Sequence, residues 1–206
     1  MPRADEKKFE GCKAEILGIY GQNGSGKTAI VDALYFLQNI MTGEKLEQSI
    51  LDYIDTDEVN AEVNAEFKIF EDSILYEVGY HILVSKADNV SIIEREYLNC
   101  AINKDGYRTN KNIFMDYQRT QSEVVFTPLK RLEELVGKDK NAKMDLIVAR
   151  KMAERGNYSY IFGKESREIF FKQREGFKEY ATVIHALFNF AVRDLFVIRN
   201  SHSGVI

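Results

Sequence analysis

The 206-residue sequence has little cysteine and little proline, two residues of each. Cys12 and Cys100 lie far apart, form no CxxC pair and have no histidine at ligand spacing, so a disulfide framework and a structural zinc site are both poorly supported. The scarcity of proline, with no Ser/Gly-rich linker and no repeat, favours one compact unit over several tethered domains.

Long apolar runs are missing as well. No run approaches the roughly 20 residues that cross a bilayer, and residues 1–8 lack the apolar core of a signal peptide. We therefore expect a cytoplasmic protein without a membrane partner. The composition, 45% hydrophobic and 29% charged, is that of a soluble globular protein. A net charge of −4 gives no long-range attraction for nucleic acid, which leaves only a local basic patch as a route to such binding.

A glycine-rich segment stands between a predicted strand and a predicted helix. The apolar run 14–20 favours a buried strand, and the following apolar residues recur at helical spacing up to Gly43, a helix stop. The segment between them matches the pattern G-x-x-x-x-G-K-[ST] in full, which arises by chance about once in a hundred chains of this length. Its residues are Gly21, Gln22, Asn23, Gly24, Ser25, Gly26, Lys27 and Thr28.

This pattern has a chemical rationale in the binding of phosphate. Gly21, Gly24 and Gly26 allow positive φ and a close approach of the backbone to phosphate oxygens. The backbone N–H groups of residues 23–28 then form an anion nest at the positive end of a helix. Lys27 supplies a charge to the β- and γ-phosphates, and the hydroxyl of Thr28 can ligate Mg²⁺. We expect ATP and Mg²⁺ as ligands, with Lys27 as the catalytic residue.

The plainer interpretation is a glycine-rich turn that happens to contain Lys-Thr. Such a turn needs one glycine, not three at these offsets, and gains nothing from Lys27. The pattern therefore favours phosphate binding.

The remainder of the chain divides into a strand-rich part and a helical part. Residues 61–126 alternate apolar and polar side chains in short segments, with a turn at Glu71-Asp72 and a hairpin turn at Asp105-Gly106, as in an antiparallel meander. Residues 127–194 show helical spacing in three stretches (127–137, 142–154 and 165–194, the last interrupted near Gly176), and an apolar segment follows at 195–198 that could form a strand. His81 is expected to be half-buried or at the surface, and His185 to lie in the core. Seven phenylalanines are expected in the core or at a subunit interface: 162, 170, 171, 177, 188, 190 and 196.

The loop, with Ile19-Tyr20 before it, resembles the Walker A loop of the ABC-like branch of P-loop ATPases. That branch includes the ABC transporter ATPases and the SMC, RecF and overcoming-lysogenization-defect (OLD) types. The nearest resemblance is to the AAA-type ATPases of the OLD-like group, associated with bacterial defence and abortive infection. Tyr76-Glu77-Val78-Gly79-Tyr80-His81-Ile82 and Ile92-Ile93-Glu94-Arg95-Glu96 are similar to the strand segments that follow the loop in this group.

The resemblance implies an α/β P-loop fold of the ABC-ATPase kind. Its mixed sheet would contain the P-loop strand and an antiparallel meander, followed by a helical region. It also implies ATP hydrolysis, and a homodimer with ATP sandwiched between two protomers. In this family a Walker B strand ending in Asp-Glu holds Mg²⁺ and activates water, yet the sequence has no such run and no Leu-Ser-Gly-Gly signature. We therefore expect residues 1–206, with segments 14–43, 61–126 and 127–194, to be the N-terminal part of a longer ATPase domain or a truncated copy of one. In either case the chain should hydrolyse ATP poorly alone.

Several alternatives remain open at this point. Gln118 or Gln121 could sense Mg²⁺ and the γ-phosphate, as a glutamine does in the family, or belong to a solvated stretch. The lysines and arginines of residues 130–155 alternate with acids, which favours a solvated face over a nucleic-acid surface. Two rival functions are a small-molecule P-loop kinase, which would require parallel strand–helix units, and a non-catalytic interaction module with a relic loop.

Overall fold

A computed structural model of the chain describes residues 26–46, 58–87, 90–120, 125–126, 140–171 and 178–198. In chain order the elements are α1 (Lys27–Thr42), β1 (Asn60–Glu71), β2 (Ile74–Ala87), β3 (Val90–Lys104), β4 (Tyr107–Arg108), β5 (Asn112–Gln118), β6 (Val125–Phe126), α3 (Lys140–Gly156), α4 (Lys164–Phe170), α5 (Lys178–Asn189) and a π-helical turn, η3 (Phe190–Asp194). The predicted strand 14–20, the predicted helix 127–137 and the region of Gly176 lie outside the described residues.

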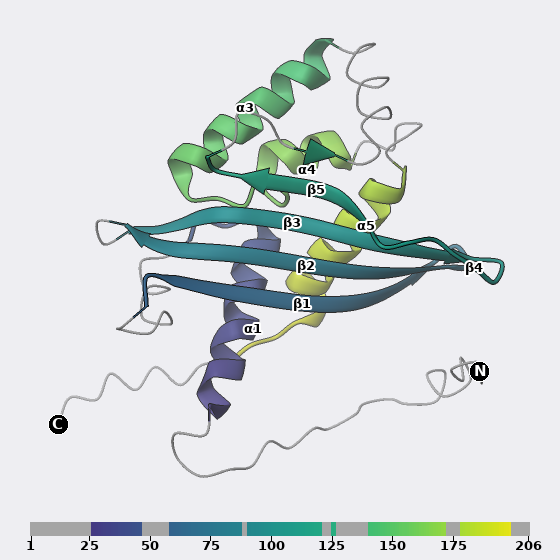
Figure 1. Cartoon of the computed structure of the whole chain (residues 1–206), viewed down its shortest axis with the longest axis horizontal. Coiled ribbons are helices and arrows are strands. Elements are labelled where there is room, and N and C mark those ends of the chain that lie inside the picture. The colour runs from purple at the N-terminus through teal and green to yellow at the C-terminus, as the bar shows by residue number, and fades with distance from the viewer. Residues whose placement is uncertain are drawn as a thin grey trace.

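The strands form one antiparallel sheet in the order β1-β2-β3-β5-β6, with β4 paired to β3 (Figure 1). The predicted meander is thereby confirmed, including the hairpin at Asp105-Gly106, where both residues have positive φ. The first turn falls at Asp72-Ser73 instead of Glu71-Asp72, because these two residues adopt the positive φ values that a tight hairpin needs.

Alternation along the strands gives the sheet one apolar face and one polar face. Tyr76, Val78, Tyr80 and Ile82 of β2 are buried, and β3 continues the same face with Leu98 and Cys100. The opposite face has Asn64, Glu66 and Lys68 exposed on β1. It also holds ion pairs between Lys111 and Glu66 and between Arg108 and Glu77. His81 is half-buried on this face, as expected, and stacks on Tyr97.

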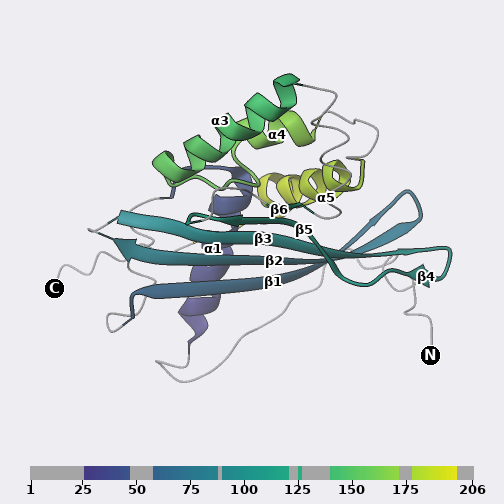
Figure 2. The same cartoon turned by 45° about the horizontal axis from the view of Figure 1, so that its top comes forward.

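Two helices distant in sequence, α1 and α5, cross the apolar face, while α3 and α4 lie toward the β5 side (Figures 1 and 2). The helix α1 buries Phe36, Leu37, Ile40 and Met41. It ends at Gly43, whose N–H donates to the carbonyl groups of Asn39 and Ile40, and its φ of 75° turns the following N–H, that of Glu44, back to the carbonyl group of Asn39 at 3.3 Å.

The last described residues, 190–198, lie beside α1 without forming a strand. The side chain of Gln38 donates to the carbonyl groups of Ala191 and Leu195, at 3.2 and 2.5 Å, and so ties η3 to α1. The strand suggested for 195–198 is wrong, because none of these residues pairs with the sheet. Phe196 is 84% exposed there, so it is not a core residue.

The other described phenylalanines of the helical part do join the core. Phe162 and Phe170 are fully buried, and Phe171, Phe188 and Phe190 pack against the core at its margin. None of the helices described here combines the length and apolar character needed to cross a membrane.

Candidate nucleotide-binding site

The described part of the glycine-rich segment is its last glycine and the start of α1. Gly26 has φ 80° and ψ 9°, the left-handed conformation that a residue with a side chain rarely adopts. No atom lies within 4 Å of the position that a Cβ on Gly26 would take. The glycine is therefore required by backbone conformation and not by crowding, and it redirects the chain directly into the helix at Lys27.

The N-terminus of α1 has the properties of an anion site. The first N–H groups of an α-helix have no partner within the helix, and the helix dipole adds positive potential there. Gly26 offers no side chain to cap them, and the first turn contains no acidic residue that would repel a phosphate. The cradle expected for a polyphosphate is thus compatible with the described backbone.

This end of α1 extends away from the sheet (Figure 1). Residues 28–31 are exposed, in contrast to the buried C-terminal half of the helix. The exposed side chain of Thr28 is compatible with a hydroxyl ligand for Mg²⁺ that takes its other ligands from phosphate and water. Among the described residues, no group of three or more His, Cys, Asp or Glu could hold a metal ion by itself.

The remaining predicted site residues cannot be compared with the structure. Gly21, Gln22, Asn23, Gly24 and Ser25 lie outside the described residues. Lys27 is described only as the first residue of the helix. Their roles stay predictions.

The two glutamines proposed as sensors differ in outcome. Gln118 is half-buried at the end of β5, and its amide donates to Asp116 Oδ2 at 3.2 Å. Asp116 also accepts two hydrogen bonds from Arg95, at 2.9 and 2.7 Å. Gln118 therefore belongs to a polar cluster of the sheet. Gln121 lies outside the described residues.

A buried carboxylate that the sequence analysis did not single out joins the sheet to the turn before α4. Glu96 of β3 is fully buried. Its Oε1 accepts hydrogen bonds from the hydroxyls of Tyr80 and Ser159, the latter at 2.6 Å. Its Oε2 accepts from the backbone N–H groups of Tyr160 and Ile161, at 2.8 and 3.3 Å. Burial raises the pKa of Glu96 because desolvation outweighs these four hydrogen bonds, each of which lowers it.

This network joins the two strand segments on which part of the sequence resemblance rests. Tyr80 and Glu96 stand in the two strand segments that resemble the ATPase group, and here they hydrogen-bond each other within the core. These two residues therefore have a structural role, the attachment of residues 159–161 to the sheet.

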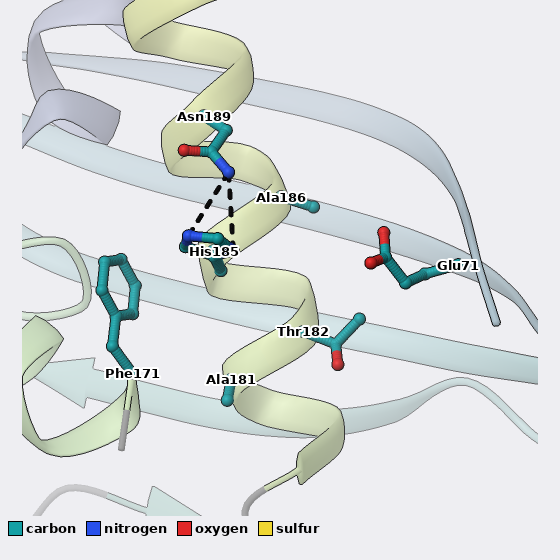
Figure 3. A pocket seen from close by; sticks show the side chains of 7 residues that line it. All are labelled: Glu71, Phe171, Ala181, Thr182, His185, Ala186 and Asn189. Atoms are coloured by element: carbon teal, nitrogen blue, oxygen red, sulfur yellow. Dashed lines mark hydrogen bonds between the residues drawn. The ribbon is translucent and has the colours of Figure 1, made fainter. Parts of the chain in front are cut away.

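A pocket of about 270 Å³ lies between α5 and the end of β1 (Figure 3). His185 and Asn189 of α5 line it, with Phe171 on one side and Glu71 on the other. His185 is exposed, so the expectation of a core histidine is wrong; its ring packs edge-on against Phe171 at 5.0 Å. No residue of α1 lines this pocket, which separates it from the predicted phosphate site.

Comparison with known protein families gives one match. Residues 16–97, less than half of the chain, match a family described as "AAA domain, putative AbiEii toxin, Type IV TA system". No curated protein and no solved structure matches the chain. The matched part includes the whole glycine-rich segment, α1, β1 and β2. The N-terminal part of the chain is therefore similar to a nucleotide-binding P-loop ATPase domain of the AAA type.

Proposed function

We propose that residues 21–28 bind the phosphates of ATP together with Mg²⁺. In this proposal the backbone N–H groups of residues 23–28 surround the β-phosphate, and Lys27 places its ammonium group against the β- and γ-phosphates. The hydroxyl of Thr28 is the protein ligand of Mg²⁺.

The observation that carries the proposal is the backbone at the end of the motif. A glycine in the left-handed conformation, without a side-chain cap of its own, leads directly into a helix whose first turn contains no acidic residue and whose residues 28–31 are exposed. A plain turn gains nothing from a Lys-Thr pair at this position, whereas in a phosphate loop of this pattern the lysine contacts the phosphates and the threonine hydroxyl binds Mg²⁺. The family match over residues 16–97 supports the same conclusion.

Hydrolysis is proposed to need residues from beyond this sequence. Phosphoryl transfer to water depends on a group that orients the water and on acids that steady Mg²⁺. The sequence has no apolar strand ending in Asp-Glu and no signature motif. We propose that these come from a Walker B and signature half, and that two protomers enclose the ATP as in the OLD, SMC and RecF types.

The cellular role follows from resemblance alone. The matching family is described by a putative AbiEii toxin and a type IV toxin–antitoxin system. A role in bacterial defence, or in a process that acts on DNA, is the corresponding proposal for this chain.

The antiparallel sheet argues against the kinase alternative. Small-molecule P-loop kinases continue from the loop into parallel strand–helix units, whereas β1, β2 and β3 are sequential antiparallel neighbours. The other alternative, a non-catalytic interaction module with a relic loop, is distinguished by its affinity for Mg·ATP, which it should lack.

Isothermal titration of the whole chain with Mg·ATP tests the proposal. Lys27→Ala removes charge-assisted contacts and should weaken binding by about 1.5–3 kcal/mol. Lys68→Ala is the matched control, since Lys68 is an exposed lysine of β1 on the polar face of the sheet. No binding at millimolar ATP, or equal binding by the Lys27 variant, would establish the relic interpretation. Steady ATP turnover by the isolated chain would refute the incomplete catalytic site.

A further inference from the structure

The helix α3 has two apolar faces, and only one of them packs against the rest of the protein. Ala149 and Ala153 are buried, and α3 lies on the outside of the molecule (Figures 1 and 2). Its outward face presents four large apolar side chains that are 42–61% exposed: Met144, Ile147, Val148 and Met152. We call these four residues the α3 stripe.

The spacing of the α3 stripe fits a helical partner. Met144, Val148 and Met152 recur every fourth residue and so form one continuous ridge about 12 Å long. Ridges of this kind pack into the grooves of another helix. The methionines at both ends have flexible side chains, which adapt to the surface of a partner.

A basic ridge runs beside this apolar ridge. Lys143 and Lys151 stand four residues before and after Ile147, and Lys140 stands seven before it, so all three lie on the same side of the helix. All three lysines are exposed, and Asp145 is the exposed acid within α3. In a chain with a net charge of −4, this helix face is therefore locally basic.

We propose that the α3 stripe and its basic ridge form a docking site for an acidic amphipathic helix of a partner protein. The partner's apolar residues pack on Met144, Val148 and Met152, and its carboxylates lie against Lys143 and Lys151. Charge complementarity of this kind speeds association and fixes the orientation of the partner.

Two other occupants fit the surface less well. A second copy of the chain would bring three lysines per copy into the interface against one exposed aspartate, and like charges placed together oppose association. A membrane-surface helix sinks a wide apolar face into the lipid and is typically rich in Trp, Phe and Leu. The α3 stripe has four side chains and none of those residues.

The test uses the whole chain and a synthetic acidic helix as the probe. The probe is a fluorescent peptide of about 18 residues, long enough to form a helix, with a leucine seam flanked by glutamates. Its counterpart has lysine in place of glutamate. Fluorescence anisotropy should detect binding of the acidic peptide to the chain and no binding of its lysine counterpart. The exposed substitution Val148→Asp should weaken that binding about tenfold or more.

Two further variants separate the proposal from a general effect of charge or of misfolding. Lys143→Glu combined with Lys151→Glu reverses the basic ridge on an exposed face and should abolish binding of the acidic peptide. Val90→Asp is the matched control, because Val90 of β3 is 45% exposed and Val148 is 43% exposed. It should leave binding unchanged, and circular dichroism should show that all the variants fold.

Results that contradict the proposal show either that another molecule binds the α3 stripe or that nothing does. Failure to bind the acidic peptide, or equal binding of both peptides, overturns the proposal. The proposal is also overturned if light scattering shows that the chain self-associates and that Val148→Asp abolishes this self-association, because a second copy of the chain then covers the α3 stripe. Binding to phosphatidylcholine vesicles that contain phosphatidylglycerol, lost in the same variant, would assign the surface to a membrane. None of these results bears on ATP affinity, so the proposal stands or falls independently of the nucleotide site.

Discussion

The hydrogen-bond network of Glu96 predicts that two substitutions at this position differ sharply in cost. Glu96→Ala removes the acceptor of two backbone N–H groups, those of Tyr160 and Ile161, and of two hydroxyls. A buried N–H group without a partner costs about 1–3 kcal/mol. Two such groups, with some relief from no longer burying a carboxylate, give a loss of about 4 kcal/mol in the free energy of unfolding.

Glu96→Gln should cost much less, about 1 kcal/mol. The amide oxygen can take the place of Oε2 and keep both backbone N–H groups satisfied. The amide nitrogen then faces the hydroxyls of Tyr80 and Ser159, which can rotate and accept, whereas a backbone N–H cannot reverse its role.

Urea denaturation followed by circular dichroism measures both variants against the parent chain. Equal losses in the free energy of unfolding for Glu96→Gln and Glu96→Ala would refute the argument. The turn would then be stabilised by the negative charge of Glu96 and not by its hydrogen bonds from the backbone N–H groups. A loss below about 1 kcal/mol for Ala would show that the turn at 159–161 does not depend on Glu96.

Three more predictions concern turns and buried groups of the core. Gly43→Ala should destabilise the protein by about 3 kcal/mol, because a φ of 75° is strained for alanine and the new Cβ would fall on the carbonyl oxygen of Phe162. Gly106→Ala is the comparison, because Gly106 has a similar φ but open space around the position of a Cβ, and it should cost about 1 kcal/mol. Thermal unfolding of the two variants compares them, and equal costs would contradict the predicted clash. Burial raises the pKa of the Cys100 thiol to about 12, so in a Cys12→Ser background this thiol should resist a maleimide at pH 8 until urea is added. Rapid labelling of the native chain would show that Cys100 is not buried. Because the pKa of this thiol is raised in the folded state, its contribution to stability should be full below pH 9 and decline as the pH rises toward 12. Alkaline denaturation would measure this decline.

Local periodicity was sufficient to predict α1 and the strands. The helix follows from apolar residues at helical spacing and a terminal glycine, and its observed bounds are Lys27–Thr42. The meander follows from alternation and from turn residues such as Asp105-Gly106, whose positive φ values the structure confirms. In both cases the determinants lie within a few residues of each other, so a single sequence contains them.

Interactions between distant residues could not be predicted in this way. Glu96 and Ser159 are 63 residues apart, and no local pattern indicates that a strand carboxylate satisfies a turn. His185 follows an apolar helical pattern and still points outward beside Phe171, since only the packing of α5 decides which side of the helix is covered. For the nucleotide site, the motif specifies the chemistry and the structure adds the conformation of Gly26 and the exposure of Thr28.

The wide gap between Glu96 and the turn that it holds has a consequence for the order of folding. The hairpin of β1 and β2 closes over a two-residue turn, so its contacts cost little loop entropy and can form early. The contact between Glu96 and residues 159–161 must instead close a loop of more than 60 residues. Since that contact can form only after the sheet exists, we expect it to form late in folding. It should therefore slow unfolding more than it accelerates folding.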